Sequence, residues 1–287
     1  MASMAQSVLQ QTRGFQEWII LDDGSTDGTS AVLSELEASV PTITVHRLTD
    51  TRPNELGQRV SSLVQHGLQR AANQNWDYWA KLDADLLLAP DYFECLLAAF
   101  ANDPGLGIAS GRALLPGRSD TWRAEWTPDY FPLGMARIYR RACWSDIGGY
   151  VADRHFDIID VYSARHKGWR TASVPETHAK LLRRVGARVE GRLGRRLDAG
   201  HGLYGIGYLP AYFLLRAVRS MWDEQPPVLA ALAMMCGYLR GALRRTRLVD
   251  VDLFHFVRRE QRSLVRAENL IRYWHERTGS RSTRPAP

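Results

Sequence analysis

The sequence predicts an α/β fold with a mostly parallel sheet flanked by helices, followed by a C-terminal helical extension. Two observations carry this prediction. Up to about residue 180, short apolar runs alternate with segments whose apolar residues recur every three or four positions, as in strands joined by crossover helices. After about residue 195 the pattern is helical up to residue 278.

The individual elements follow from this alternation. A strand is expected over residues 18–21, and a polar turn then leads to a helix over residues 29–38. Proline followed by an acid at Pro90 and Asp91 suits the first turn of another helix. The remaining expected elements are strands over residues 43–45, 77–82, 106–113, 134–139 and 170–174 and an amphipathic helix over residues 57–72.

A change in composition near Arg195 marks the expected domain boundary, because arginines crowd a glycine-containing stretch there. Residues 1–195 are expected to form the α/β domain and residues 196–278 a basic, partly apolar helical region. Residues 279–287 are rich in Ser, Arg and Pro and are expected to be disordered.

Two apolar segments stand out in the helical region, residues 203–215 and 228–243. Both are shorter than the roughly 20 apolar residues that a membrane-spanning helix requires. Arginines border each segment, as in helices that lie in the lipid headgroup layer. Helices that pack their apolar faces on the protein core would show the same pattern, so both interpretations stay open.

Composition excludes several classes of protein. The chain has 287 residues, of which 45% are hydrophobic, so it can bury a sizeable core. Three widely separated cysteines argue against a thiolate zinc site or a disulfide framework. The N-terminal residues lack the apolar core of a signal peptide, which favours a cytoplasmic location.

Charge divides the chain into an acidic and a basic part. Residues 1–179 carry 16 Lys or Arg and 22 Asp or Glu, whereas residues 180–287 carry 21 and 9. Clustered carboxylates often serve a cation, and a basic region suits phosphate, nucleic acid or an anionic membrane. The arginines fall on Leu- and Ala-rich helices without a recognition module, which argues against nucleic acid.

Two acidic motifs follow expected strands. Asp83 and Asp85 end the strand at residues 77–82, where two carboxylates repel each other unless a cation lies between them. Their oxygen ligands suit Mg²⁺ or Mn²⁺ held together with substrate phosphates. Asp22 and Asp23 open a second motif, Asp-Asp-Gly-Ser-Thr-Asp-Gly-Thr, in which glycines permit tight turns and hydroxyls cap free amides.

These motifs, together with the Ser-Val-Leu-Gln-Gln-Thr run at residues 7–12 and the Lys-Leu-Asp-Ala-Asp run at residues 81–85, resemble the inverting family 2 glycosyltransferases of the GT-A fold. The resemblance spans residues 7–184. It implies sugar transfer from a nucleotide-diphosphate sugar to an acceptor hydroxyl, as in polysaccharide or glycolipid assembly. A lipid-linked acceptor and peripheral contact with the inner face of the cell membrane fit the basic helical region.

The resemblance also implies roles for individual residues. Asp23 would contact the nucleotide base beside Asp22, with Ser25 in the same turn and Lys81 at the start of the second motif. Asp85 would bind the diphosphate through Mg²⁺ or Mn²⁺. Asp83 would hold either the ribose or the water shell of the metal.

The catalytic base is expected on the helix after Ile147-Gly148-Gly149-Tyr150, a run that is similar to the glycine turn of the family. The usual Glu-Asp pair is replaced here by Asp157 and Asp160, whose spacing places both on one helix face. We favour Asp157 as the base, and Asp160 stays open as the alternative. His178 is a candidate metal ligand, with Lys180, Arg183 and Arg184 as alternatives that would neutralise the leaving diphosphate.

The chain departs from the family at its start, because only six residues precede the Ser-Val-Leu run where the family has a first strand. We therefore expect the sheet to lack that strand. A non-catalytic, sugar-nucleotide-binding scaffold at the membrane is the alternative that this departure favours. An aspartyl phosphatase also uses Asp-x-Asp, but this chain has Leu87 where that class has Thr or Val.

Overall fold

The computed structural model describes residues 1–48, 56–117, 121–125, 127–182, 192–223 and 227–265. The chain forms two compact units, Met1–Ala187 and Arg188–Pro287. The division precedes the boundary predicted near Arg195, which falls inside helix α7 (Arg192–Ile206). Arginine is a good helix former, so the arginines around this position belong in part to a helix rather than to a linker. The tail predicted to be disordered lies outside the described residues.

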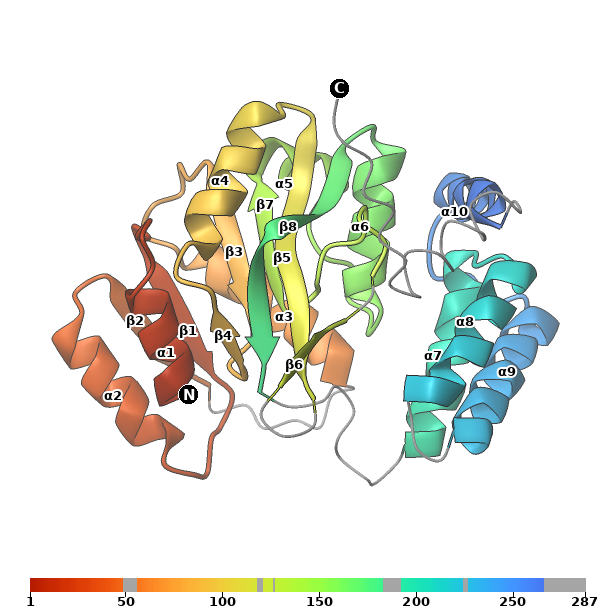
Figure 1. The fold of residues 1–287 in the computed structure, drawn as a ribbon, viewed down its shortest axis with the longest axis horizontal. Helices are drawn as coiled ribbons and strands as arrows, with labels where there is room; N and C mark the ends of the chain where they lie inside the picture. The colour runs from red at the N-terminus through yellow and green to blue at the C-terminus, as the bar shows by residue number, and fades with distance from the viewer. Residues whose placement is uncertain (49–55, 118–120, 126, 183–191, 224–226, 266–287) are drawn as a thin grey trace. The chain divides into compact units, whose positions relative to one another are not determined.

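Two sheets form the framework of the first unit (Figure 1). In the smaller one, β1 (Trp18–Asp22) pairs in parallel with β2 (Ile43–Arg47). The larger one has the strand order β3-β7-β5-β8-β4, and β6 pairs with β5. Its strands are β3 (Tyr78–Leu82), β4 (Leu86–Leu88), β5 (Leu106–Pro116), β6 (Trp122–Ala124), β7 (Ala136–Arg140) and β8 (Arg170–Leu181).

The larger sheet is mixed, which corrects the prediction of a mostly parallel sheet. Within the described ranges, its single parallel pair is β5–β8. The pairs β3–β7, β5–β7, β4–β8 and β5–β6 are antiparallel. Strand β7 follows the hairpin of β5 and β6 rather than a crossover helix, and the short strand β4 was not expected. The sequence pattern therefore did not predict that β7 and β4 run antiparallel to their neighbours. The wider prediction of an α/β fold with flanking helices is confirmed.

Helices cover both faces of the larger sheet because side chains alternate along each strand. Ala109 and Ile138 belong to a core shared with α1 and α4. Ile108 and Tyr139, their neighbours in sequence, belong to a core shared with α3, α5 and α6. The helices of this unit are α1 (Ala2–Leu9), α2 (Thr29–Ser39), α3 (Leu56–Gln69), α4 (Tyr92–Asn102), α5 (Arg141–Ile147) and α6 (Phe156–His166).

The two sheets are not joined by a strand. In the described part of the chain, β1 pairs with β2 alone and β3 pairs with β7 alone, so each has one edge without a strand partner. Helix α3 packs against both β1 and α6, and so connects the smaller sheet to the helices of the larger one.

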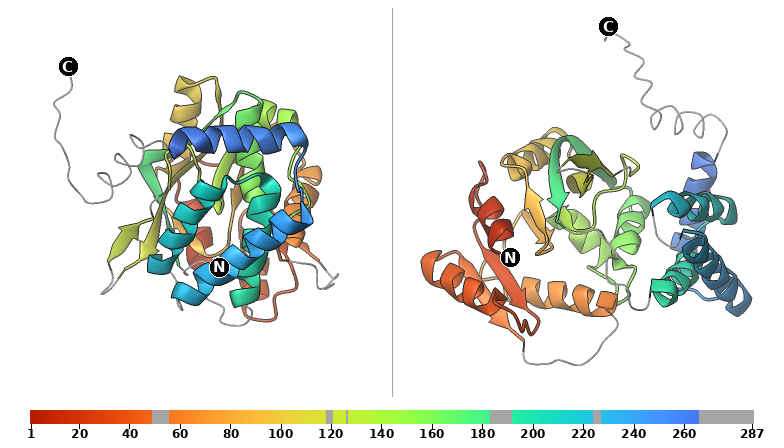
Figure 2. Two further views of the ribbon diagram at one scale, coloured as in Figure 1. Left: turned by 90° about the vertical axis from the view of Figure 1, so that its right-hand side faces the viewer. Right: turned by 60° about the horizontal axis from the view of Figure 1, so that its bottom comes forward.

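The second unit consists of helices in its described residues (Figure 2). Helices α7 and α9 approach each other closely at Gly200 and Gly237. A Cβ on Gly237 would overlap the backbone oxygen of Leu197. No helix in the described ranges is both long enough and apolar enough to cross a membrane. The helices of this unit are α7 (Arg192–Ile206), α8 (Pro210–Asp223), α9 (Pro227–Arg244) and α10 (Val251–Leu264).

Candidate active site

The second acidic motif forms the turn between β3 and β4. Strand β3 ends at Leu82 and β4 begins at Leu86, so Asp83 and Asp85 occupy a three-residue turn. The backbone N–H of Asp83 donates to the Met135 carbonyl at 2.9 Å, and the Leu182 N–H donates to the Asp85 carbonyl at 2.9 Å. Backbone bonds on both sides therefore hold the turn in place.

Lys81 lies behind this turn and is buried. Its ammonium group donates to the Asp83 carboxylate and, at 3.1 Å, to the Gly134 carbonyl. These bonds engage two of its three donors. Lys81 was predicted to bind the nucleotide sugar, and the structure places it where it orients Asp83.

Asp157 lies in the first turn of α6 and approaches the same place from the other side. Its Oδ2 is 3.0 Å from the position that a Cβ on Gly134 would take. The pKa of Asp83 is raised, first by burial and then by the charges of Asp85 and Asp157, while Lys81 opposes the shift. Asp83, Asp85 and Asp157, which we call the acidic cluster, are thus electrostatically coupled.

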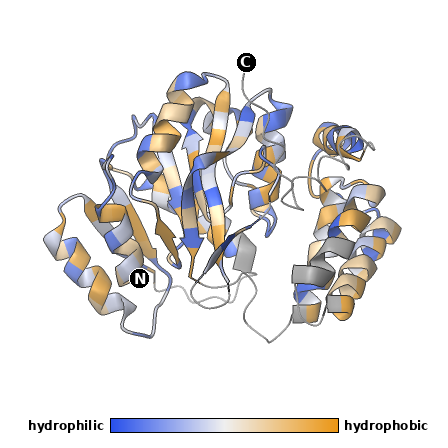
Figure 3. Ribbon diagram, in the orientation of Figure 1, coloured by the Kyte–Doolittle hydropathy of each residue, from blue (hydrophilic) through white to orange (hydrophobic). Residues whose placement is uncertain are grey.

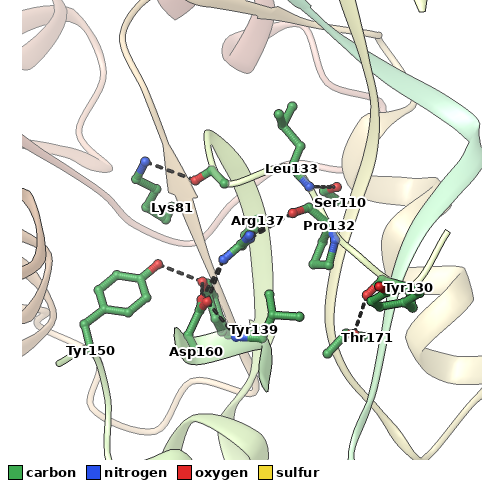
Figure 4. Close-up of polar contacts among 12 residues, drawn as sticks. Lys81, Ser110, Tyr130, Pro132, Leu133, Arg137, Tyr139, Tyr150, Asp160 and Thr171 are labelled. Carbon is green, nitrogen blue, oxygen red and sulfur yellow. Dashed lines mark hydrogen bonds and ion pairs between the residues drawn. The ribbon is translucent and has the colours of Figure 1, made fainter. Parts of the chain in front are cut away.

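Asp160 lies one helical turn after Asp157 but is fully enclosed. Both of its carboxylate oxygens accept from Nη1 of Arg137, at 2.8 and 2.7 Å, and Tyr139 also donates to it (Figure 4). Asp160 is 3% exposed. Its carboxylate is therefore occupied by internal donors, which leaves Asp157 as the acid of this helix that lies against Gly134.

The first acidic motif closes the end of β1. Asp22 is buried and accepts from the Ser25 backbone N–H at 2.9 Å and from the Ser30 hydroxyl at 3.2 Å. The hydrogen bonds from Ser25 are the largest cause of the lowered pKa of Asp22. Gly24 has a φ of 79°, which suits glycine and lets the turn close. Asp22 thus organises the turn, while the Ser25 side chain stays exposed.

Asp23 points away from this internal network and is exposed. Its two oxygens accept from the guanidinium of Arg59 on α3. A carboxylate has about four lone-pair sites, so this fork leaves acceptor capacity for a further ligand. Through Arg59, Asp23 is connected to the helix that packs against α6.

Comparison with known proteins identifies the family of this chain. Residues 2–156 match the family described as Glycosyl transferase family 2. The chain belongs to this family. The resemblance inferred from the acidic motifs is confirmed.

A relative of this family 2 glycosyltransferase is the polyprenol monophosphomannose synthase of Mycolicibacterium smegmatis. The two are 30% identical over 179 residues, which cover 55% of this chain and 65% of the relative. The chain therefore spans less than two thirds of the relative's length.

Two solved structures are similar to this chain. The crystal structure of GalNAc-T7 with UDP, GalNAc and Mn²⁺ matches with a TM-score of 0.55 at 14% identity, over 76% of this chain and 47% of that one. The mannosyltransferase PcManGT from Pyrobaculum calidifontis, in complex with GDP-Man and Mn²⁺, matches with a TM-score of 0.49 at 14% identity, over 96% of this chain and 79% of that one. The first match, together with the family, confirms the GT-A fold.

His178 is not brought to the acidic cluster. Strand β8 pairs with β4 so that Ala179 lies opposite Leu88, and Leu182 is the residue that reaches Asp85. His178 precedes Leu182 by four residues, which is about 13 Å along a strand. Among the residues that the structure describes, no three His, Cys, Asp or Glu side chains are grouped to hold a metal ion. Arg183 and Arg184, the alternatives to His178, lie outside these residues.

Two arginines of this region, Arg59 and Arg137, were not predicted as functional residues. Arg59 belongs to the expected helix over residues 57–72, but nothing local indicated that Asp23 would be its partner. Arg137 stands between Ala136 and Ile138 in an expected strand, and all three are fully or almost fully buried. A buried arginine requires an acidic partner, so a cation inside an apolar strand was a usable signal.

Proposed function

We propose that this protein transfers a sugar from a nucleotide-diphosphate sugar to an acceptor, with inversion at the anomeric carbon. The acidic cluster carries the proposal, because its members come from a β-turn and from a helix more than 70 residues later in the chain. Holding three carboxylates within electrostatic reach of one another costs free energy unless the site serves a cation or a reacting group.

The first acidic motif is the proposed site of the nucleotide. The exposed Asp23 carboxylate accepts hydrogen bonds from donors on the base, which is uracil, guanine or thymine in our proposal. Asp22 keeps the turn closed and Arg59 fixes the orientation of Asp23. The Ser25 hydroxyl bonds Asp22 and, being exposed, keeps acceptor lone pairs that a ribose hydroxyl could use.

The donor set of the second motif fits a divalent cation. Asp83 and Asp85 would hold Mg²⁺ or Mn²⁺, which suit carboxylate oxygens completed by substrate phosphates. The raised pKa of Asp83 supports this fit, because a cation would relieve the repulsion from Asp85 and Asp157 that contributes to the shift. When bound, the ion would neutralise charge that develops on the leaving diphosphate. Lys81 keeps Asp83 in place.

Asp157 is the proposed general base for an acceptor hydroxyl. It lies against Gly134, where the absence of a side chain gives its carboxylate room on the side of Asp83 and Asp85. A positioned base contributes about 10²- to 10⁴-fold to the rate. Asp160 is unsuited to this role because Arg137 and Tyr139 occupy its oxygens.

The proposed acceptor is lipid-linked. The relative named polyprenol monophosphomannose synthase supports this class, and the acceptor oxygen then belongs to either a hydroxyl or a phosphate. The two cases differ in their need for a base, since a phosphate monoester is already ionised near neutral pH. Loss of Asp157 would therefore disable transfer to a hydroxyl far more than transfer to a phosphate.

Helix α9 supports contact with a membrane surface. Surface helices normally turn a polar face to solvent, yet α9 exposes apolar side chains at spacings of four and seven residues, which share one helix face. Val228, Leu232, Leu239 and Leu243 are 53, 50, 59 and 86% exposed. Figure 3 shows how much of this unit is hydrophobic. Exposed arginines accompany the stripe, so we propose that α9 lies on an anionic bilayer.

Donor turnover tests the enzymatic proposal. Release of nucleoside diphosphate from UDP-, GDP- and dTDP-linked hexoses would be measured with Mn²⁺ for wild type, Asp85→Ala and Asp157→Asn. Glu35→Gln, an exposed acid on α2, is the matched control. Losses of about 10²-fold or more in the two site variants but not in the control are expected. Cation-dependent binding without any turnover would support the scaffold instead, and unchanged turnover in both site variants would refute the assignment.

Vesicle flotation tests the membrane proposal separately. Wild type should float with vesicles containing phosphatidylglycerol and less with neutral phosphatidylcholine, because arginines favour an anionic surface. Leu239→Ser with Leu243→Ser should weaken flotation at least about tenfold, since each leucine gains roughly 1.5–3 kcal/mol on burial. Leu193→Ser, an exposed leucine on α7, is the control. Equal flotation of all variants would exclude α9 as the contact.

A further inference from the structure

An arginine and an aspartate form an ion pair inside the first unit, away from solvent. Nη1 of Arg137 lies 2.7 Å from Oδ2 of Asp160, and both side chains are 1% exposed. Burial by itself would lower the pKa of Arg137, but the acidic groups around it, Asp160 first among them, together outweigh burial and the pKa is raised. The short contacts of the guanidinium with both carboxylate oxygens identify a buried ion pair.

Stability alone does not account for such a pair. Removing two charges from water is costly, and replacing a buried ion pair by apolar side chains of similar volume is often neutral or stabilising. An ion pair does, however, demand a defined geometry from both partners, because its hydrogen bonds are directional. The question is which parts of the protein this geometry fixes.

Arg137 binds more than Asp160. Its Nε and Nη2 donate to the Pro132 carbonyl at 3.2 and 2.8 Å (Figure 4). Lys81 lies directly opposite Arg137 in the β3–β7 pair and donates to the Gly134 carbonyl at 3.1 Å. Residues 132–134 are therefore held at two carbonyls by two neighbouring cations, one paired with Asp160 and the other with Asp83.

The same segment lies between the two halves of the acidic cluster. The Met135 carbonyl accepts from the Asp83 N–H at 2.9 Å, and Gly134 contacts Asp157. Asp160 fixes the helix that carries Asp157, because it lies one turn later on α6 and is bound to both Arg137 and Tyr139 on β7. Arg137 thus connects α6 and the 132–135 segment at one point.

From these contacts we infer that Arg137 and Asp160 are a positioning pair, which sets the register of α6 against the 132–135 segment and thereby holds Asp157 at the acidic cluster. The inference rests on the proposed function for the role of Asp157. Neither residue touches the reacting atoms in this scheme. Their effect is on how often Asp157 occupies its productive position.

The test replaces both charges at once, so that no unpaired charge is left buried. Arg137→Met with Asp160→Leu should unfold cooperatively at a temperature close to that of wild type. The kcat for release of nucleoside diphosphate should fall at least about tenfold while the donor KM changes less than about twofold, because misplacing a catalytic group by about 1 Å can cost 10²-fold. Arg137→Lys keeps the charge but loses the planar fork, so its kcat should lie between those of wild type and the double variant.

Arg140→Met is the matched control, because Arg140 lies on the same strand and is partly buried. Its guanidinium donates to the Leu106 carbonyl at 2.9 Å and the Phe100 carbonyl at 2.7 Å, with no acidic side chain among these partners. Its kcat per folded molecule should equal that of wild type. An equal loss of kcat in the control and the double variant would show a general packing effect and overturn the inference.

Hydrogen exchange supplies a readout that does not depend on turnover. In the double variant, amides of residues 133–135 and of the first turn of α6 should exchange at least about tenfold faster, while the β5 amides keep their wild-type rates. Unchanged exchange in these two segments, or an unchanged kcat in a folded double variant, would overturn the inference. A wild-type protein that turns over no sugar nucleotide would instead refute the proposed function. The exchange result would still decide whether Arg137 and Asp160 position these two segments.

Discussion

Gly134→Ala should impair catalysis without impairing folding. The added methyl would lie 3.0 Å from Oδ2, 3.4 Å from Cβ and 3.6 Å from Cγ of Asp157. An ordinary carbon–oxygen contact is about 3.3–3.5 Å, so the carboxylate must retreat by about 0.3–0.5 Å. Gly134 is not among the glycines with a positive φ, and alanine can therefore adopt its backbone conformation.

The size of the effect follows from this displacement. If a shift of about 1 Å costs about 10²-fold, a shift of 0.3–0.5 Å costs roughly four- to tenfold in kcat. That ratio corresponds to about 0.8–1.4 kcal/mol of transition-state stabilisation. Because the donor contacts other residues in our proposal, its KM should stay near the wild-type value.

Steady-state release of nucleoside diphosphate, measured beside thermal unfolding, provides the assay. Gly14→Ala is the control, because a Cβ there meets no atom within 4 Å. Wild-type kcat in a folded Gly134→Ala protein would refute the reasoning, since Asp157 would then tolerate displacement. A large fall in the unfolding temperature would show instead that the methyl disrupts packing rather than the base.

Three further outcomes are expected. Asp83→Asn should raise the unfolding temperature of the metal-free protein at pH 7, because the raised pKa of Asp83 makes its ionised form unfavourable. This gain should vanish below pH 3.8, where the carboxyl is protonated in both the folded and the unfolded protein. Added Mn²⁺ should raise the unfolding temperature of wild type but not of the variant. Asp22→Asn should cost about 1 kcal/mol in urea unfolding at pH 7, and because the pKa of Asp22 is lowered, the cost should shrink as pH falls through and below 3.8. Gly237→Ala should destabilise the second unit by about 3 kcal/mol or more, because its methyl overlaps the Leu197 backbone, whereas Gly194→Ala, with open space around it, should not.

Local patterns predicted the elements well, because helix and strand periodicities are written in neighbouring residues. The strand before Asp22 and the strand before Asp83 are both present, and each motif lies in the turn that follows it. Strand directions were predicted less well, because a reversal depends on which connection is a hairpin, and the short strand β4 carries too few residues for a pattern.

The order of residues along the chain is enough to predict that acidic turns end two strands and that the helix after the turn at residues 147–150 carries two acids on one face. Turn chemistry and helical spacing settle those features locally. It also determined the family, because the order of the motifs along the chain is a property of the sequence alone.

Only the tertiary structure decided which of the two acids is available. Asp157 and Asp160 are alike in type and in helix, but Arg137, 23 residues before Asp160, encloses one and not the other. The pairing of β8 with β4 likewise separates His178 from Asp85. Burial and strand register depend on contacts between distant parts of the chain, which no local pattern records.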